Sequence, residues 1–496
     1  MGTLGQAVKS ELASLEENDV YDIVDAPVDR KIVPSKWVFK IKHNADGTID
    51  RYKARLVAKG FAQQPGVDFD EVFSPVVRYD SLRLLLGLAA VNGWKPRQLD
   101  IKTAFLYGKL KEEVYMQLPE GSRVAGKVAK LKRCIYGLKQ APREWFGRLV
   151  TFLRPYGFVS STFDPCVLAH ESGKLFLAIY VDDITVFGDS GPLLDQVIEL
   201  LKTEFKVNDL GFVNWLLGIQ IDLNNEGITL SQSAFIDKVL QRFNMDDCNP
   251  VSTPIEPNAT LTRDSGTPLQ TATRYQQIVG SIMYLVTATR PDLAFTITFL
   301  SQFASAPTDL HLKAAQRVLR YLKGTRDWKL LYPWNTHLAL TGFSDASHGN
   351  CYDTRRSYSG YIFRLGDCTI SWRAHKQKSV SHSTLDAEYM GLAAANRHYR
   401  WLTDALASLL QRSDTPAALF NDNMAAIDFA HNQKINDRTK HIDIAYHSTR
   451  ELVESGRLVL MHVPGEDNLA DICTKGLPRP RLEQLCNSIT NTEHAN

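Results

Sequence analysis

Two adjacent aspartates, Asp182 and Asp183, stand between the apolar segments LFLAIYV and ITVF. This pattern predicts a β-hairpin with two carboxylates at its tip. Aspartate is also a common turn residue, so turn formation alone would explain the pair. A third carboxylate, Asp100, ends the strand-like segment WKPRQLD and could either cap a helix or join the pair. Carboxylates gathered in this way can hold Mg²⁺, and two such ions can promote phosphoryl transfer.

A second set of acidic residues lies in the last third of the chain. Helical periodicity from about Thr384 to Leu410 places Glu388 in the middle of an apolar stripe. A carboxylate among core-facing side chains is costly unless it is paired or binds a metal, so a cation is expected near Glu388. The candidates to share this cation are Asp345 in GFSDAS, Asp422 in LFNDN and Asp471 in NLADICTKGL. Asp422 could instead cap a helix, and Asp471 could be a solvated surface residue.

Length and composition limit the class of protein and the number of domains that can carry these residues. The 496 residues are about three times the usual domain length, so two or three domains are expected. With 44% hydrophobic and 23% charged residues, the chain does not belong to the disordered, collagen-like or low-complexity classes. The formal net charge is only +2, so any site for a polyanion must come from local clustering.

The cysteines and the apolar runs restrict the environment of the chain. Seven cysteines are scattered without a C-x-x-C pair or histidines at metal spacing, which argues against a zinc site or a disulfide framework and favours a reducing compartment. The N-terminus has no basic region followed by an apolar stretch, and the run around LLLGLAAV is too short to span a bilayer. Neither secretion nor membrane insertion is therefore predicted.

Local patterns predict the elements that carry the candidate residues. WVFKIKH, NADGT and IDRYKARLVAK read as a hairpin with Arg51, Lys53, Arg55 and Lys59 on one face, although an ordinary solvated face explains them equally well. The segment from Pro250 to Pro268 is rich in Pro, Thr and Ser and reads as a long surface connection. From Leu338 onward, three strands, a long helix and further short strands and helices predict a separate α/β unit.

The order of RYKARLVAKGF, LDIKTAFLYG, IYGLKQAPREW and YVDD resembles the reverse transcriptase of copia-type (Pseudoviridae) LTR retrotransposon polyproteins over essentially the whole chain. The resemblance implies an α/β (α+β) fold class, in which a right-hand polymerase of fingers, palm and thumb is followed by a ribonuclease H-like domain with a mixed sheet. The expected limits are a lead segment at 1–30, fingers and palm at 31–225, a thumb and connecting helical region at 226–335, the ribonuclease H domain at 336–480 and a polar tail at 481–496.

The same resemblance assigns roles in the polymerase. Asp100, Asp182 and Asp183 would bind two Mg²⁺ ions in the palm. The remaining roles fall on residues around them: Lys53 and Arg55 would hold the nucleoside triphosphate, Phe105 would be the steric gate against ribose, Gln140 would line the nucleotide pocket, and Leu217 and Gly218 would form the primer grip.

The segments SDAS, STLDAEY, NDN and LAD-x-x-TK are similar to the ribonuclease H domain at the end of copia-type polyproteins. This similarity implies a site of four carboxylates and two Mg²⁺ ions made by Asp345, Glu388, Asp422 and Asp471. Many ribonucleases H carry a mobile histidine in the loop before the last aspartate. Here that loop reads VPGEDNLAD, with His462 just before it, and His441 is interpreted as structural.

The resemblance therefore implies an RNA- and DNA-directed DNA polymerase with ribonuclease H activity, which copies retrotransposon RNA into cDNA. Its cofactor would be Mg²⁺, with Mn²⁺ as a substitute. Its partners would be an RNA template, a DNA primer, the RNA/DNA hybrid and dNTPs. No membrane partner is expected, and homodimerisation is left open. It would act in the cytoplasm in virus-like particles, its cDNA being destined for the nucleus, as a C-terminal product of a longer polyprotein. The alternatives are a catalytically silent nucleic-acid-binding protein derived from such an element and a DNA polymerase with a proofreading exonuclease.

Overall fold

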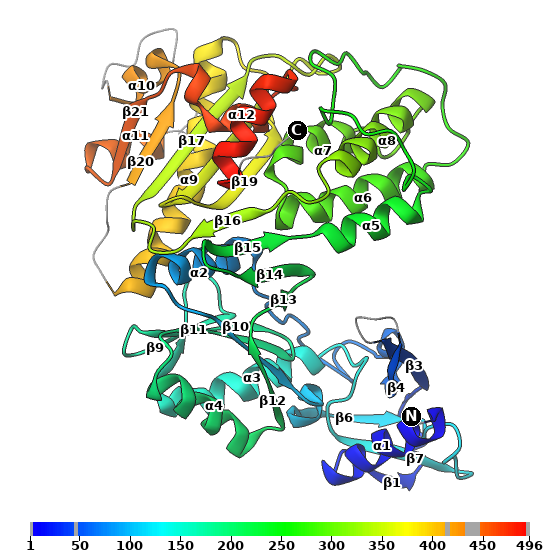
Figure 1. Ribbon diagram of the computed structural model, residues 1–496. Helices are drawn as coiled ribbons and strands as arrows, with labels where there is room; N and C mark the ends of the chain where they lie inside the picture. The colour runs from blue at the N-terminus through cyan, green and yellow to red at the C-terminus, as the bar shows by residue number, and fades with distance from the viewer. Residues whose placement is uncertain (1–2, 44–47, 412–416, 432–446, 493–496) are drawn as a thin grey trace. The chain divides into compact units, whose positions relative to one another are not determined.

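The computed structural model describes residues 3–43, 48–411, 417–431 and 447–492 (Figure 1). The chain forms two compact units, each built from several separate stretches of sequence. Unit 1 comprises Met1–Val77, Arg97–Val186 and Gly191–Gly211, and unit 2 comprises Arg78–Pro96, Phe187–Ser190 and Phe212–Asn496.

The largest sheet of unit 1 has six strands in the order β12-β5-β11-β10-β9-β8. The strands are β5 (Arg97–Ile101), β8 (Phe158–Ser160), β9 (Val167–His170), β10 (Leu175–Tyr180), β11 (Asp183–Gly188) and β12 (Val207–Phe212). Helices α3 (Ala141–Leu153) and α4 (Pro192–Glu204) share one core with this sheet, in which Trp145 and Leu201 pack with Leu177 and Ile184. The predicted hairpin of two apolar strands is confirmed, because β10 and β11 are neighbours and are buried along almost their whole length.

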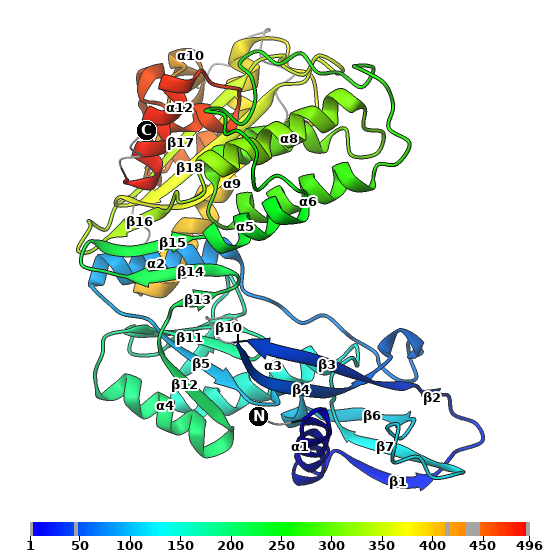
Figure 2. The ribbon, with the colours of Figure 1, turned by 45° about the vertical axis from the view of Figure 1, so that its right-hand side comes forward.

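The N-terminal part of unit 1 forms a smaller sheet and a two-stranded ribbon. The sheet has the order β1-β7-β6-β2, with β1 (Tyr21–Asp25), β2 (Ile32–Val33), β6 (Lys109–Met116) and β7 (Lys127–Arg133). The ribbon pairs β3 (Ser35–His43) with β4 (Ile49–Ala58), which confirms the predicted basic hairpin, although most of its NADGT turn lies outside the described residues. Helix α1 (Leu4–Glu17) lies against β4 (Figure 2), where Glu11 accepts a hydrogen bond of 3.1 Å from the Leu56 amide.

Unit 2 begins with helix α2 (Tyr79–Asn92) and a four-stranded sheet of order β13-β14-β15-β16. The strands are β13 (Trp215–Leu216), β14 (Ile219–Leu223), β15 (Gly227–Ser231) and β16 (Leu330–Pro333). Between β15 and β16 the chain forms the helices α5 (Ser233–Arg242), α6 (Thr273–Ala288), α7 (Ala294–Ser301) and α8 (Asp309–Gly324). Helix α8 begins after Thr308, whose hydroxyl accepts the His311 amide, and its apolar stripe is buried.

The C-terminal part of unit 2 is a mixed five-stranded sheet of order β19-β18-β17-β20-β21. Its strands are β17 (Leu340–Ser347), β18 (Tyr358–Leu365), β19 (Cys368–Lys376), β20 (Ala417–Asn421) and β21 (Leu458–His462). Strand β17 is antiparallel to β18 and parallel to β20, which confirms the expected mixed sheet. Helix α9 (Thr384–Leu410) packs on β17 and β18 (Figure 1). The described residues of this part also form α10 (Met424–His431), α11 (His447–Glu454), the 3₁₀ turns η6 (Gly465–Asp467) and η7 (Leu469–Cys473), and α12 (Arg479–Thr490).

The expected polar tail at 481–496 is wrong for the residues up to Thr490. Helix α12 spans Arg479–Thr490, and its Leu482, Leu485, Cys486 and Ile489 are all buried. These residues recur at helical spacing, so an amphipathic pattern is present within the polar composition.

The expected limits at 225/226 and 335/336 do not coincide with the boundaries of the compact units. Pairing of β15 with β16 holds the residues around both limits in one sheet. Helix α2 belongs to unit 2 because it packs on β16 and β19. Its Arg83 donates a 2.7 Å hydrogen bond to the Ile370 carbonyl and lies 3.9 Å above the Trp372 ring.

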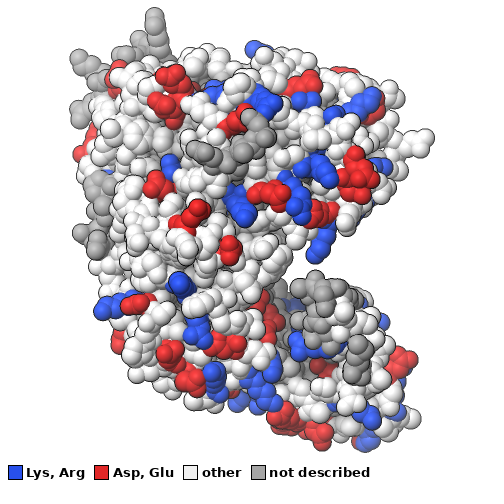
Figure 3. Space-filling view, viewed as in Figure 1, with Lys and Arg blue, Asp and Glu red and all other residues white. Residues whose placement is uncertain are grey.

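Charged residues of both signs are intermixed over the face drawn in Figure 3, in keeping with the small net charge. Within the described part of the chain, no helix combines the length and the hydrophobicity needed to cross a membrane.

Candidate active sites

The first candidate site is at the tip of the β10–β11 hairpin in unit 1. Asp183 is the register partner of Asp100 on the neighbouring strand β5, and the Ile101 amide donates to the Asp182 carbonyl at 2.9 Å. Val181 has φ +57°, a left-handed conformation that is strained for a β-branched residue. The Trp145 indole donates to its carbonyl at 2.6 Å, and this bond helps to hold the tip in place.

A cleft of about 520 Å³ lies beside this tip, within unit 1. Its wall includes Asp100 and Asp182 together with Lys53 and Arg55 of the ribbon. The Arg55 Nε is shielded from solvent and has no hydrogen-bond partner among the described residues. A cationic wall opposite two carboxylates suits a polyphosphate that is bound through divalent cations.

An aromatic residue that sequence reasoning missed, Tyr136, also lines this cleft. The Arg55 guanidinium lies 4.2 Å above its ring, and Phe105 packs edge-on behind it with ring centroids 5.0 Å apart. Burial raises the pKa of Tyr136, so its hydroxyl stays protonated at neutral pH. The signal was available in IYGLKQ, where an aromatic residue comes directly before a glycine.

The position of Tyr136 is fixed by its contact with the ribbon. Its carbonyl accepts a 2.8 Å hydrogen bond from the Ala58 amide of β4. Gly137 has φ +92°, and a Cβ added there would overlap the Ala58 carbonyl oxygen, so only glycine allows this close approach. The loop that carries Tyr136 is therefore docked on the strand that carries Arg55.

Gln140 is not among the residues that line this cleft, and neither are Phe105 and Asp183. Gln140 is 1% exposed at the start of α3. Its amide nitrogen donates to the Asp68 carbonyl at 2.8 Å, and its amide oxygen accepts from Gln63 at 3.0 Å. Buried side-chain amides in proteins are usually hydrogen-bonded in this way, so these bonds are consistent with a structural role for Gln140.

The predicted primer-grip residues form the turn of the β13–β14 hairpin in unit 2. Leu217 and Gly218 both have positive φ, +51° and +77°, as a two-residue hairpin turn requires. The Tyr284 and Tyr79 hydroxyls donate to the Leu217 carbonyl at 2.8 and 3.1 Å. A Cβ on Gly218 would overlap the Tyr284 hydroxyl, so this turn needs glycine.

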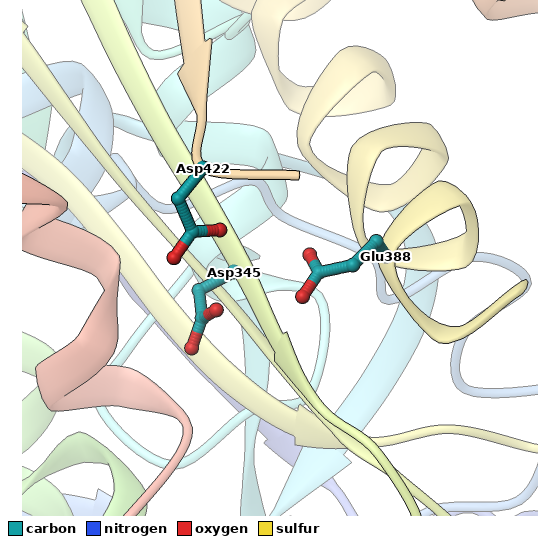
Figure 4. Close-up of side chains that lie close together, drawn as sticks. All are labelled: Asp345, Glu388 and Asp422. Atoms are coloured by element: carbon teal, nitrogen blue, oxygen red, sulfur yellow. The ribbon is translucent and has the colours of Figure 1, made fainter. Parts of the chain in front are cut away.

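The second candidate site is in unit 2, where three elements bring their carboxylates together. Figure 4 shows Asp345 and Asp422 beside each other and Glu388 directed toward them from α9. One ligand oxygen of each residue lies within 4.8 Å of those of the other two. Among the residues that the structure describes, this is the one group of three or more potential metal ligands with that spacing.

The local sequence explains why these side chains converge. Gly391 lets α9 approach β17 closely, since a Cβ there would lie 3.3 Å from the Asp345 carbonyl oxygen. Glu388 is 5% exposed and accepts a 3.2 Å hydrogen bond from Asn421, the residue before Asp422. Burial, and then the charge of Asp345, raises the pKa of Glu388. This arrangement suits a divalent cation, which would compensate the buried negative charge with oxygen ligands that Mg²⁺ prefers.

Asp471 is near this triad but does not belong to it. It is 6% exposed on η7, so the alternative of a solvated surface residue is wrong. The ion-pair partners of its carboxylate are Lys475, at 2.6 Å, and Arg481 on α12, at 3.1 Å. Pairing with two cations explains how a carboxylate beside the apolar Leu469 and Ile472 can be buried.

The two histidines considered from the sequence have different outcomes. His462 ends β21 as the register partner of Asn421 and is exposed. His441 lies outside the described residues.

Comparisons with known proteins relate the chain to reverse transcriptases and retrotransposon polyproteins. Residues 18–257 match the family described as reverse transcriptase (RNA-dependent DNA polymerase). The chain is 40% identical over 489 residues to the retrovirus-related Pol polyprotein from transposon RE1 of Arabidopsis thaliana, which covers 97% of this chain and 33% of that protein. For the polyprotein from transposon TNT 1-94 of Nicotiana tabacum, the identity is 38% over 510 residues, with coverage of 99% and 38%.

A shorter relative is matched over almost its whole length. The chain is 33% identical over 299 residues to a putative transposon Ty5-1 protein of Saccharomyces cerevisiae, with coverage of 59% of this chain and 97% of that protein. By contrast, the chain spans only 33% and 38% of the length of the two plant polyproteins.

Two solved structures share the fold at low sequence identity. A foamy viral protease-reverse transcriptase in complex with an RNA/DNA hybrid has a TM-score of 0.51 and 13% identity, with coverage of 95% of this chain and 54% of that chain. Its dRH form in complex with double-stranded DNA has a TM-score of 0.52 and 14% identity, with coverage of 92% and 69%. This likeness confirms the expected mixed α/β fold of a reverse transcriptase.

Proposed function

The chain belongs to the copia-like retrotransposon Pol polyproteins of the reverse transcriptase family, and we propose that it is an RNA- and DNA-directed DNA polymerase with ribonuclease H activity. One observation carries the proposal: each unit has its own set of carboxylates, and the two sets have different surroundings. Asp100 and Asp182 share a cleft with cationic side chains, whereas Asp345, Glu388 and Asp422 form a triad of which Asp345 and Glu388 are buried.

In the polymerase site, Asp100, Asp182 and Asp183 would hold two Mg²⁺ ions, which Mn²⁺ could replace. These ions supply charge stabilisation for the attacking and leaving oxygens of nucleotidyl transfer when bound. Lys53 and Arg55 bind and orient the triphosphate of the incoming dNTP through charge-assisted hydrogen bonds.

The other proposed residues select the sugar and hold the primer. Phe105, backed by its contact with Tyr136, restricts the space for a ribose 2′-hydroxyl. Leu217 and Gly218 present the turn of their hairpin to the primer end, and the two tyrosine hydroxyls keep this turn rigid.

In the second site, Asp345, Glu388, Asp422 and Asp471 would hold the ions that promote hydrolysis of the RNA strand. A hybrid duplex is recognised by its shape and by 2′-hydroxyls in its wide minor groove, so cleavage would be largely independent of sequence. The products would carry 3′-hydroxyls. RNA template, DNA primer and their hybrid are then the macromolecular partners, and the cytoplasmic virus-like particle is the proposed place of action.

The test combines both activities in one reaction. A labelled RNA template with a DNA primer is incubated with the wild type, Asp183→Asn and Glu388→Gln, and both cDNA growth and RNA fragmentation are measured. The first variant should lose extension and keep cleavage, and the second should do the opposite.

Each alternative function gives a distinct result in the same assay. No extension by the wild type in either Mg²⁺ or Mn²⁺ would indicate a silent nucleic-acid-binding protein. Removal of a mismatched DNA 3′ end, with the RNA strand left intact, would indicate a proofreading exonuclease.

A further inference from the structure

One lysine enters the acidic site of unit 2. Lys475 follows η7, and its Nζ lies 2.6 Å from Asp471 Oδ1 and 3.8 Å from Asp345 Oδ2. Its side chain is 40% exposed, whereas those of Asp345 and Asp471 are 4% and 9% exposed. The lysine therefore reaches from solvent into a buried space between two carboxylates.

The carboxylates around this ammonium group are held from behind. Gly360 allows η7 to lie directly on β18, because a Cβ there would overlap Cys473. The Thr474 hydroxyl donates a hydrogen bond to Asp345. The Arg481 guanidinium donates one of 3.1 Å to Oδ2, the other carboxylate oxygen of Asp471. Asp345 and Asp471 thus cannot easily turn away from each other.

One oxygen at this place depends on a nearby cation. Asp471 Oδ1 is shielded from solvent, and its ion-pair partner among the described residues is the Lys475 ammonium, 2.6 Å away. A buried carboxylate oxygen is costly unless a donor or a closely placed cation compensates it. The Lys475 ammonium is the cation that is present there.

We propose that Lys475 occupies the position between Asp345 and Asp471 that a second divalent cation requires. The triad binds one cation while Lys475 stays in place, and the second cation binds only when the lysine side chain moves out. This inference rests on the proposed ribonuclease H function and adds a control on its second metal ion. The long flexible stem and partial exposure of Lys475 allow the movement.

Competition of this kind predicts a specific change in metal binding. Without the lysine charge, Asp345 and Asp471 repel each other and offer their oxygens to a divalent cation. Lys475→Met should lower the Kd of the second Mn²⁺ about tenfold, equivalent to about 1.4 kcal/mol, and leave the first Mn²⁺ affinity within about twofold.

The experiment is a Mn²⁺ titration of the full chain, followed by electron paramagnetic resonance of free Mn²⁺. All proteins carry Asp182→Asn and Asp183→Asn, so that the polymerase carboxylates do not contribute. Lys475→Gln is titrated in parallel and should behave as Lys475→Met does, which keeps the test informative should one variant fail to fold.

Arg481→Met is the matched control, since it also removes a cation from Asp471 but not from the space between the two carboxylates. Its second Mn²⁺ affinity should change less than threefold. An equal gain in Arg481→Met and Lys475→Met would overturn the proposal, because the effect would then be one of net charge. Unchanged binding in both Lys475 variants would overturn it too.

Failure of the proposed function has a different signature. Glu388→Gln in the same background should remove the first Mn²⁺. If this variant binds Mn²⁺ as its parent does, the triad is no metal site, and both the function and the inference fall. If Glu388 is needed but Lys475 is not, only the inference falls.

Discussion

The two carboxylate sites differ in how much of a metal site the protein itself completes. In unit 1, Asp100 and Asp182 are half-buried at the wall of a cleft that also carries Lys53 and Arg55. In unit 2, the triad has its ligand atoms within 4.8 Å, and two of its members are almost fully buried. On the proposed function, the first site would need the phosphates of a substrate to complete the coordination of Mg²⁺, whereas the second is preformed because its three ligand atoms already lie together. We therefore expect the first to bind its ions with the nucleotide and the second to bind an ion alone.

The largest effect should come from Asp182→Asn. Loss of one carboxylate removes several kcal/mol of charge stabilisation, so primer extension should fall about 1,000-fold or more. Binding of Mn²⁺ to the protein without nucleotide should not change, because the preformed site is the other one. Single-turnover extension and a Mn²⁺ titration measure the two quantities. A loss of Mn²⁺ binding without nucleotide would contradict the contrast between the sites.

Tyr136→Ala should have the next largest effect. Its ring lies under Arg55 and in front of Phe105, so its loss should release both side chains and raise the KM for dNTP about tenfold, worth about 1.4 kcal/mol. Phe105→Ala should mainly increase ribonucleotide incorporation. Steady-state kinetics with dNTP and rNTP separate the two effects.

Tyr115→Ala serves as the control for Tyr136→Ala. Tyr115 is a half-buried tyrosine of β6 that does not line the cleft, so its loss should leave the KM for dNTP within about twofold. An equal rise of KM in both tyrosine variants would mean that the effect is one of general stability.

Glu388→Gln should reveal what the burial of Glu388 beside Asp345 costs the metal-free protein. Burial and the charge of Asp345 raise the pKa of Glu388 above its usual value of 4.5. The contribution of Glu388 to metal-free stability is therefore fully present below pH 4.5 and is lost as the pH rises through the raised pKa. At pH 8 in EDTA, the variant should be more stable than the wild type by about 1–3 kcal/mol.

Urea denaturation of the wild type and Glu388→Gln at a series of pH values measures this difference. The gain should shrink toward pH 4.5, and Mn²⁺ should cancel it by stabilising only the wild type. A difference that does not depend on pH would show that ionisation of Glu388 is not the cause.

The smallest effect on activity should come from Gln140→Leu. Because Gln140 is buried in a hydrogen-bond network away from the cleft, the KM for dNTP should change less than about twofold, whereas stability should fall by about 1–3 kcal/mol. Gln63→Leu, which removes the partner amide, should have the same profile. A clear rise of KM in Gln140→Leu alone would return this residue to the nucleotide pocket.

Local patterns predicted the elements that carry the chemistry. The apolar run on each side of Asp182 and Asp183 predicted the hairpin, and helical periodicity predicted both the bounds of α9 and the buried position of Glu388. These patterns are short-range: the spacing of apolar side chains along a single helix or strand is enough to recognise them.

What the sequence did not reveal depends on contacts between distant segments. The ion pair of Asp471 with Arg481 requires α12. The polar composition of this segment indicates a tail, and only the spacing of its leucines indicates a helix. The position of Tyr136 depends on docking against β4, and that of Gln140 on Gln63, 77 residues away. The unit limits depend on pairing of β15 with β16 and on packing of α2 against β19.

The placement of α2 has a consequence for synthesis of the protein. All residues from Ser81 to Ala90 are buried in the folded structure. The hydrogen-bond partner of Arg83, the Ile370 carbonyl, is 287 residues further along the chain. A ribosome adding roughly 5–20 residues each second would leave this apolar helix uncovered for many seconds. Nascent chains released early should therefore aggregate or recruit chaperones, and fragments that end before β19 should be poor material for expression.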